Sequence, residues 1–333
     1  MRVLAITNMY PSPETPYAGV FIEQQIKGLR ATGVDVQVMV VDRLKQGMKA
    51  YLGLGRRVLR RLATAPVDLI HLMYGGVMAQ QVADAIKDLP LIVTFHGSDL
   101  LGQNLSGLMR KWVSAYGVLC SHKAAVKAQG IITVSKILLD SLPKSIDRAK
   151  IRVIPCGIDL ERFKPLSHEE SCNRLNWNPK RFHVLFPATM GDPVKRPELA
   201  RAAVNLLRQK GIRAQFHFLS GVPNTDVPVW INASNVLLLT SLHEGSPTVV
   251  KEALACNIPV VSVDVGDVRE RIEGIEGCYL ADSAAPALAE KLYLVSQSRR
   301  WIDSRTSIQE LSILQVARRL HQFYKEVLSG IRS

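Results

Sequence analysis

Short apolar runs alternate with longer amphipathic stretches along the whole of this 333-residue chain. Strand-like runs lie at residues 3–7, 34–41, 68–73, 91–96, 131–135 and 152–155, and then at 183–187, 214–220, 235–241, 259–265 and 278–281. Helical patterns separate them. Between residues 20 and 31, for example, apolar side chains recur every three or four positions until Gly33 ends the pattern. The alternation predicts repeated βα units, and therefore an α/β fold with parallel sheets.

Turn-forming residues cluster most densely in mid-chain, at residues 155–159 and 163–165. We therefore place a boundary near residue 164 and expect two doubly wound, Rossmann-like domains, at residues 1–164 and 165–305. The last segment, 306–333, carries one amphipathic pattern from about residue 306 to 328. It predicts a C-terminal helix that returns to pack on the N-terminal domain.

The composition narrows the class of protein. Hydrophobic residues make up 47% of the chain and charged residues 21%, which excludes intrinsic disorder. No apolar run approaches the length of a membrane span, and no signal peptide is expected at the start. The five cysteines are odd in number and widely spaced, which argues against a disulfide framework and a zinc site. A cytoplasmic location fits this cysteine usage best.

The net charge of +13 points to an anionic partner, and residues 1–164 carry most of it, with 22 Lys and Arg against 12 Asp and Glu. One acid-free segment has seven basic residues: Arg43, Lys45, Lys49, Arg56, Arg57, Arg60 and Arg61. A second cluster contains Arg110, Lys111, His122, Lys123 and Lys127. The pattern of the first segment predicts an amphipathic helix. This helix could form a surface that contacts anionic lipid or the lipid phosphate of an acceptor. Alternatively, its basic residues could form a face that is only solvated.

The most informative segment follows the apolar run at 236–240. Glu244, Gly245 and Ser246 form a turn, and Pro247 is suited to the first turn of a helix. This places the turn at the carboxyl end of a parallel strand and at a helix N-terminus, where ligands bind in open α/β sheets and where free amide groups favour an anion such as a diphosphate. Glu252 lies eight residues after Glu244. In the alternative interpretation, Glu244 is an acid that caps the helix and Glu252 is a solvated helix residue.

Glu244 and Glu252, with seven residues between them, resemble the E-x7-E motif of family 4 retaining glycosyltransferases, which have the GT-B fold. Further segments agree with that family in order and context: residues 18–21, 94–100, 133–135, 153–159 with 163–165, and 259–268. The resemblance covers nearly the whole chain. It implies two Rossmann-like domains that face each other across a cleft, an N-terminal one for the acceptor and a C-terminal one for a nucleotide sugar.

The resemblance also implies roles for single residues. Glu244 would touch the donor sugar, and Glu252 would bind the ribose. Lys195 would lie on the donor phosphates. The donor diphosphate would be held by the amide groups around Gly245, Ser246, Pro247, Thr248 and Val249. The family commonly has an arginine shortly before this lysine, which is missing at residues 188–194, so Arg196 or the amide groups would take its place.

Two residues of the N-terminal half complete the expected site. His96 ends a strand-like run, and the resemblance places it beside the transferred sugar as a catalytic residue; the alternative is a histidine that only fixes its own loop. Gly19 resembles the glycine loop that approaches donor phosphate and acceptor. The family often has two adjacent glycines there, whereas this chain has Ala18 and Gly19.

The expected function is therefore retaining transfer of a hexose from a UDP- or GDP-sugar to a polysaccharide or lipid-linked acceptor, in cell-envelope polysaccharide biosynthesis. No D-x-D motif is evident, so we expect no cofactor and no metal. The resemblance implies a front-face mechanism. A nucleotide-sugar epimerase or hydrolase on the same scaffold is the alternative enzyme. A nucleic-acid-binding protein is disfavoured because no known binding signature is present. The protein would be cytoplasmic, or peripheral on the inner face of the plasma membrane through residues 43–61.

Overall fold

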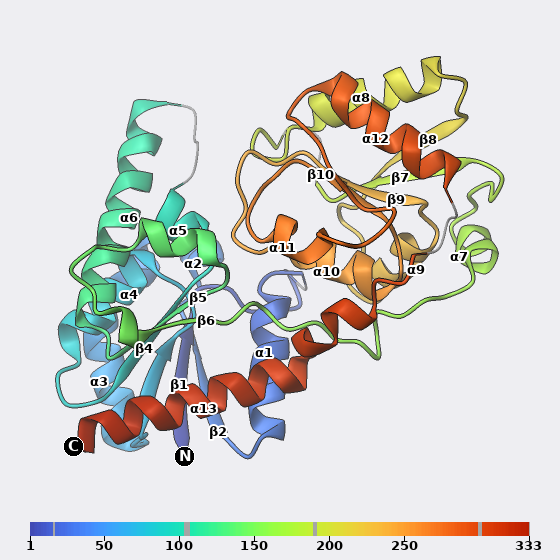
Figure 1. Cartoon of the computed structure of the whole chain (residues 1–333). Coiled ribbons are helices and arrows are strands. Elements are labelled where there is room, and N and C mark those ends of the chain that lie inside the picture. Colours follow the sequence, from blue (N-terminus) through green and yellow to red (C-terminus); the bar gives the residue numbers. More distant parts are fainter. Residues whose placement is uncertain (16, 103–106, 189–191, 299–301, 333) are drawn as a thin grey trace. The chain divides into compact units, whose positions relative to one another are not determined.

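The structure is a computed structural model that describes residues 1–15, 17–102, 107–188, 192–298 and 302–332. Its contacts divide the chain into two compact units. Unit 1 comprises residues 1–157 and 313–333, and unit 2 comprises residues 158–312. Each unit is a parallel sheet with helices on both faces (Figure 1). The expected α/β fold with two Rossmann-like domains is confirmed.

Unit 1 contains a six-stranded sheet in the order β2-β1-β3-β4-β5-β6. Its strands are β1 (Arg2–Thr7), β2 (Asp35–Val40), β3 (Leu69–Leu72), β4 (Leu91–Phe95), β5 (Gly130–Thr133) and β6 (Ile151–Val153). All neighbouring strands pair in parallel. The order reverses at β1, so the carboxyl ends of β1 and β3 form the crevice where doubly wound sheets bind ligands.

Helices cover both faces of this sheet. One face packs on α1 (Val20–Ala31) and α13 (Ile313–Arg332), which share a core of Ile22, Ile26, Leu29, Leu320 and Tyr324. The other face packs on α3 (Leu54–Thr64), α4 (Gly76–Ala85) and α6 (Leu108–Lys127). Shorter elements are α2 (Arg43–Gln46), η1 (Gly47–Tyr51), α5 (Ser98–Leu101), η2 (Lys136–Ser141) and η3 (Arg148–Lys150). The C-terminal helix therefore packs in unit 1, as expected.

A buried polar chain fixes α13 to the sheet. The His71 ring on β3 lies 2.6 Å from the Tyr324 hydroxyl through Nδ1 and 2.6 Å from the Thr94 hydroxyl through Nε2. Burial lowers the pKa of His71 to about 3, so the ring stays neutral. Because both ring nitrogens have partners, the buried ring does not carry the cost of an unsatisfied polar group.

Unit 2 contains a five-stranded sheet in the order β11-β10-β9-β7-β8. Its strands are β7 (Phe182–Phe186), β8 (Ala214–Phe218), β9 (Val236–Leu239), β10 (Val260–Ser262) and β11 (Tyr279–Leu280). Its helices are α7 (His168–Arg174), α8 (Pro197–Gln209), α9 (Val227–Asn232), α10 (Thr248–Ala255), α11 (Val268–Ile272), α12 (Ala285–Gln297) and η4 (Thr306–Leu311). The winding matches that of unit 1, and the reversal falls between β7 and β9.

The division of the chain differs from the predicted boundary near residue 164. Ile158 and Phe163 belong to the core of unit 2, so the unit begins earlier than the turn residues suggested. The single helix expected over residues 306–328 is also divided, into η4 and α13. Ser312 separates them because it is extended and pairs with Ile158 in an isolated bridge.

The amphipathic helix expected over residues 43–61 is likewise interrupted. The structure has α2, η1 and α3 instead, because Gly47 and Gly53 adopt φ values of +57° and +61° that a continuous helix cannot contain. The arginines at positions 56, 57, 60 and 61 are exposed on α3. Within the described part of the chain, none of the helices has the length and apolar character that a bilayer crossing requires.

Candidate active site

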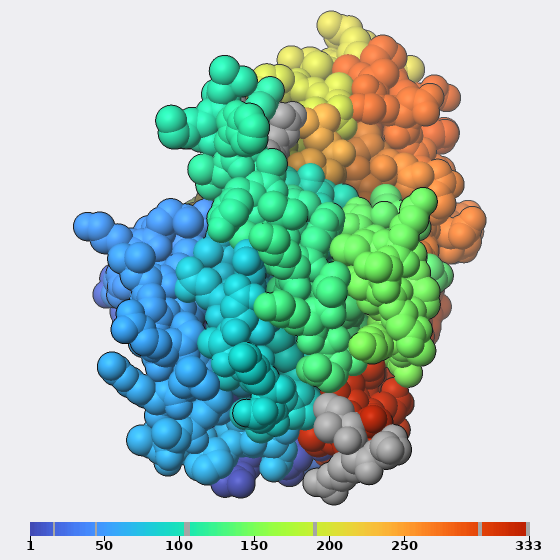
Figure 2. Space-filling view, turned by 90° about the vertical axis from the view of Figure 1, so that its left-hand side faces the viewer, coloured from blue at the N-terminus to red at the C-terminus, as the bar shows by residue number. Residues whose placement is uncertain are grey.

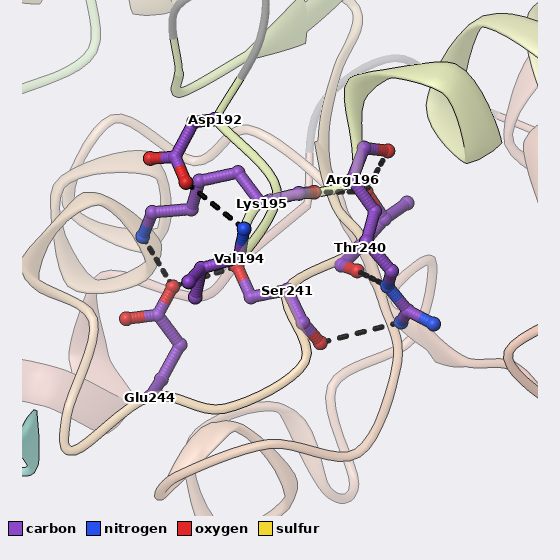
Figure 3. A network of polar contacts seen from close by, with 7 residues as sticks. All are labelled: Asp192, Val194, Lys195, Arg196, Thr240, Ser241 and Glu244. Carbon is purple, nitrogen blue, oxygen red and sulfur yellow. Dashed lines mark hydrogen bonds and ion pairs between the residues drawn. The ribbon is translucent and has the colours of Figure 1, made fainter. Parts of the chain in front are cut away.

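Lys195 and Glu244 meet where the strand order of unit 2 reverses. Lys195 follows β7 and Glu244 follows β9, the two strands on either side of the reversal. The Lys195 ammonium group forms an ion pair with Glu244 Oε1, and the Ser241 hydroxyl donates to the same oxygen at 2.7 Å (Figure 3). The side chains are 27% and 15% exposed, so a ligand can still reach the pair. The structure thus brings together two residues that lie 49 positions apart.

Backbone contacts hold the two loops against each other. The Thr240 hydroxyl donates to Lys195 O at 2.7 Å, and the Leu242 amide donates to Val194 O at 2.8 Å. Asp192 Oδ1 accepts from the Val194 amide at 3.0 Å and turns the chain before the lysine. Positioning of the ammonium group is therefore shared by both loops.

Arg196 points away from Lys195, as Figure 3 shows. Its Nε donates to Thr240 O at 2.6 Å and its Nη2 to Ser241 O at 3.3 Å, while Nη1 donates to the Ser283 hydroxyl. The residue sits at φ +54° directly before α8, which turns its side chain to the other side of the loop. In this structure Arg196 stabilises the end of β9, and its expected contact with donor phosphate stays a prediction.

The segment from Gly245 to Val249 leads into α10, and Pro247 is its N-cap, without a capping side chain. Hence the amide groups of Thr248 and Val249 donate to no acceptor among the described residues. Ser246 turns away and donates from its hydroxyl to Asp267 Oδ2 at 2.8 Å. An open helix N-terminus of this kind attracts an anion.

Gly266 supports this segment from the neighbouring loop. It has φ +56°, and a Cβ atom there would lie 2.7 Å from Gly245 O. A side chain would therefore push the 245–249 segment out of place. The sequence TVV at the start of α10 keeps apolar Val250 in the core while Thr248 and Val249 stay partly exposed.

Glu252 projects from the second turn of α10 and is half-buried. Its carboxylate accepts no hydrogen bond from the described residues, although Arg162 lies close enough to act on it electrostatically. Burial raises the pKa of Glu252 to about 7, against the opposing effect of Arg162 and Lys251. Arg162 Nη2 is itself buried and has no hydrogen-bond partner. Together they form a polar pair able to take a ligand hydroxyl.

His96 in unit 1 is held at the end of β4. Its Nε2 donates to Met73 O at 3.0 Å, and Cys156 Sγ lies 3.7 Å from Nδ1. The ring stacks on Tyr74 and contacts Phe21 at the start of α1. These contacts fix the ring, and its expected place beside the transferred sugar stays a prediction.

Gly19 is the N-cap of α1, with φ +68°. A Cβ atom there would lie 2.5 Å from Met9 O, so no other residue fits without moving the loop after β1. The loop and His96 lie near each other, because Phe21 joins the first turn of α1 to the His96 ring. The neighbouring Pro16 lies outside the described residues.

Sequence reasoning missed Asp99, which is buried behind His96. Its two carboxylate oxygens accept from the amides of Gly75, His96 and Gly97 at 2.9–3.2 Å. Burial raises the pKa of Asp99 to about 6, although these amide groups favour its ionised form. Asp99 lies within the segment 94–100 that resembles the family, and an acid three residues after a strand-ending histidine was the available signal.

A pocket in unit 1, also missed, opens at the carboxyl ends of β1, β3 and β4. Its lining includes Asn8, Arg43, Tyr51, Tyr74, Ser98, Val113 and Tyr116. Asn8 Oδ1 is buried without a hydrogen-bond partner. Among the described residues, no three His, Cys, Asp or Glu side chains gather so as to hold a metal ion.

Two family models match this chain. The model of Glycosyltransferase Family 4 matches residues 18–162, and the model of Glycosyl transferases group 1 matches residues 182–297. TuaC of Bacillus subtilis (strain 168), assigned as a teichuronic acid biosynthesis glycosyltransferase, is 27% identical over 90% of each chain.

Two solved structures show the same fold. Sucrose-phosphate synthase from Thermosynechococcus elongatus superposes with a TM-score of 0.80 at 16% identity, covering 99% of this chain and all of the other. Anabaena HepE in complex with UDP superposes with a TM-score of 0.70 at 17% identity, covering 98% and 100%. With two matched ranges that span most of its length and a fold of the GT-B class, the chain belongs to glycosyltransferase family 4 and is a glycosyltransferase.

Proposed function

We propose that this glycosyltransferase moves a hexose from a nucleotide-diphosphate sugar to a polysaccharide or lipid-linked acceptor, with retention of anomeric configuration. The observation that supports it most is the Lys195–Glu244 ion pair at the strand reversal, next to the open N-terminus of α10. A cation, an acid and free amide groups at one place suit a ligand that carries both sugar hydroxyls and phosphates.

The diphosphate would lie on the N-terminus of α10. The amides of Thr248 and Val249 would donate to it, and the helix dipole would favour its charge. Lys195 would move its ammonium group from Glu244 toward the phosphates, and Glu244 would then accept from hydroxyls of the donor sugar. Since these groups neutralise charge that grows as the diphosphate leaves, they stabilise the transition state more than the ground state.

The nucleoside would lie beside Glu252, whose carboxylate would accept from the ribose hydroxyls. Arg162 would keep that carboxylate ionised when the ligand further excludes water. UDP is the nucleotide bound in the HepE structure, which supports a uridine nucleotide over GDP. The positive groups named here would carry the diphosphate in our proposal, with no metal ion and no other cofactor.

Retention follows from attack on the face from which the nucleotide leaves. The acceptor hydroxyl oxygen would bond to the anomeric carbon while the bond from that carbon to the diphosphate oxygen breaks. The electron pair stays on the diphosphate, which takes the acceptor proton. This front-face step needs no carboxylate nucleophile, unlike a double displacement.

The acceptor would bind unit 1, near His96 and Gly19. The exposed arginines of α3 support the expected contact with an anionic lipid surface, although Arg57 also donates to Ala50 O and Arg61 to Gln37 Oε1. The assignment of TuaC to teichuronic acid biosynthesis supports a cell-envelope polysaccharide as the product. We therefore place the protein at the inner face of the plasma membrane.

Ligand-dependent stability and product analysis test the proposal. A nucleotide at 100 times its dissociation constant should stabilise the fold by about 2.7 kcal/mol, so thermal shifts with UDP, GDP and ADP identify the base. Mass and NMR analysis of products from the matching donors then gives the sugar and its anomeric configuration. Product formed without acceptor would favour the epimerase or hydrolase, and an inverted anomer would contradict the front-face step.

A further inference from the structure

The N-terminal half of α6 exposes an apolar surface. Leu108, Met109 and Trp112 are 80%, 79% and 75% exposed. Three more apolar side chains of the same helix are about half exposed: Val113, Tyr116 and Leu119. We call these six residues the α6 apolar face. Their spacing of three and four positions places them along one side of the helix.

This arrangement is the reverse of an ordinary surface helix, which exposes its polar side. The C-terminal half of α6 does pack in the usual way, since Cys120 is buried and Ala124 and Ala125 belong to the core shared with α4. The N-terminal half leaves Trp112 and its neighbours in water, where each apolar side chain costs free energy relative to a buried one. Contiguous exposed apolar surface of this kind marks a binding surface.

The charges around the α6 apolar face are positive. α6 contains no acidic residue, and Arg110 and Lys111 follow its first exposed apolar pair. α3, α4 and α6 lie side by side on one face of unit 1 (Figure 2), and α3 adds four exposed arginines without an acid. Unit 1 as a whole has 24 Lys and Arg against 11 Asp and Glu, a net charge of +13, whereas unit 2 has 18 of each.

We propose that the α6 apolar face inserts into the interface of an anionic membrane. Aromatic and aliphatic side chains on one side of a helix, with Lys and Arg beside them, suit the boundary between acyl chains and anionic head groups. A protein partner would need acidic groups matched to these basic residues, whereas an anionic bilayer supplies both negative charge and apolar depth. The insertion element is α6, and the arginines of α3 add attraction of about 1 kcal/mol each near the head groups.

Insertion at α6 would bring the pocket of unit 1 to the membrane. Val113 and Tyr116 belong both to the α6 apolar face and to the pocket lining, together with Arg43 and Tyr74. A polar head group in the pocket would thus have an apolar route beside it for its tail. The acceptor is then lipid-linked and not a soluble glycan; this last step rests on the proposed function, whereas the membrane contact does not.

Trp112 provides the measurement, because it lies on the α6 apolar face. Full-length protein is mixed with phosphatidylglycerol or phosphatidylcholine vesicles, and binding is followed by co-sedimentation and by tryptophan quenching with lipids brominated near the head group. We expect binding and quenching with the anionic vesicles only. Trp112→Phe should keep binding and lose most of the quenching, since Trp177, Trp230 and Trp301 lie elsewhere in the chain.

The decisive variant is Met109→Ser with Trp112→Ser, which removes two exposed side chains and leaves the core intact. We expect vesicle binding to fall by about tenfold or more. The matched control is Ile137→Ser, which removes an apolar side chain 51% exposed on η2 of the same unit and should bind as the wild type does. Thermal shift with UDP should be the same for all three proteins.

Three results would overturn the proposal. If the double variant bound anionic vesicles as tightly as the wild type does, the α6 apolar face would not contribute to binding, and the arginines of α3 would account for the attraction to the membrane. Equal recovery of wild-type protein in the supernatant with both vesicle types would exclude the membrane. A wild-type dimer that the double variant converts to monomer, without vesicle binding, would assign the face to a second copy. Loss of the UDP shift alone would instead contradict the proposed donor chemistry.

Discussion

Unit 1 and unit 2 wind their sheets in the same way but carry different charge. Both reverse strand order beside their first strand, β1 in unit 1 and β7 in unit 2, and both place polar residues at the carboxyl ends next to that reversal. Unit 1 holds the whole net charge of +13, and unit 2 is neutral overall. The shared winding supplies a ligand crevice in each unit, and the side chains placed there decide what it binds.

The two crevices use acids differently. In unit 2, Glu244 pairs with a cation and Glu252 accepts no hydrogen bond from the described residues, so both oxygens of Glu252 are available to a ligand. In unit 1, the carboxylate oxygens of Asp99 accept hydrogen bonds from backbone amides, and these bonds organise the loops of the pocket. The carboxylates of Glu244 and Glu252 therefore suit the ligand contacts of the proposed function, whereas Asp99 has a structural role.

The largest effect is expected from Glu244→Gln. The amide keeps the size of the side chain but removes the charge that pairs with Lys195, so transfer should fall by about 10²–10³-fold while the fold and nucleotide binding persist. Steady-state transfer assays check this, with exposed Glu276→Gln as the matched control. If Glu244→Gln transferred sugar at the wild-type rate, the assignment of Glu244 to the active site would be wrong.

Glu252→Ala should act on nucleotide binding. Loss of one or two charge-assisted hydrogen bonds at about 1.5–3 kcal/mol each weakens affinity by roughly ten- to several-hundredfold. Isothermal titration with UDP measures it, and Glu290→Ala, an exposed acid of the same unit, is the control. Unchanged affinity would mean that the ribose lies elsewhere.

Asp99→Asn should lower stability without a direct effect on the donor. The new NH2 group would face backbone N–H donors, so we expect a loss of about 2–4 kcal/mol in the free energy of unfolding at pH 8. Denaturant unfolding checks it against Asp140→Asn, the same change at an exposed position. If the free energy of UDP binding fell by more than the free energy of unfolding, Asp99 would act on the donor, and its purely structural role would be contradicted.

The smallest effect concerns pH. Burial raises the pKa of Glu252 to about 7 from 4.5, so the folded protein binds more protons than the unfolded chain between these values. Stability without nucleotide should therefore decline as pH rises through that window. Glu252→Gln removes the contribution of this carboxyl to the decline, and its free energy of unfolding should exceed that of the wild type at pH 8 by on the order of 2 kcal/mol. If the difference in the free energy of unfolding between Glu252→Gln and the wild type did not change with pH, the raised pKa of Glu252 would be contradicted.

Much of the fold could be predicted from the sequence because buried parallel strands read as short apolar runs. Each of the eleven expected runs overlaps a strand, and the helix at Val20–Ala31 begins and ends where its apolar spacing and Gly33 indicated. Glu244 lies in the turn after β9 and Glu252 in the second turn of α10, as the predicted order of strand, turn and helix indicated, while their ligand roles stay predictions.

Other features depend on contacts that sequence distance conceals. The pocket of unit 1 joins residues from 8 to 118, and the exposure of Trp112 depends on how little of the described part of the chain packs over the first turns of α6. The contacts of Arg196 with the end of β9, made from a residue with positive φ, could not be read from the sequence either. The helix expected over residues 43–61 is interrupted because Gly47 and Gly53 adopt positive φ values, which the composition of the segment did not reveal.

The pairing of Ile158 with Ser312 has a consequence for engineering. Unit 2 begins and ends at one point, where Ile158 N–H donates to Leu311 O at 2.8 Å and Arg305 donates to Leu160 O and Phe163 O. Gly157 and Ile313, on the other side of the junction, are also adjacent, since a Cβ atom at Gly157 would lie 3.0 Å from Ile313 Cα. Residues 158–312 are thus one compact unit whose two ends are adjacent, so the unit can be excised for separate expression while a short linker joins Gly157 to Ile313 in the remainder.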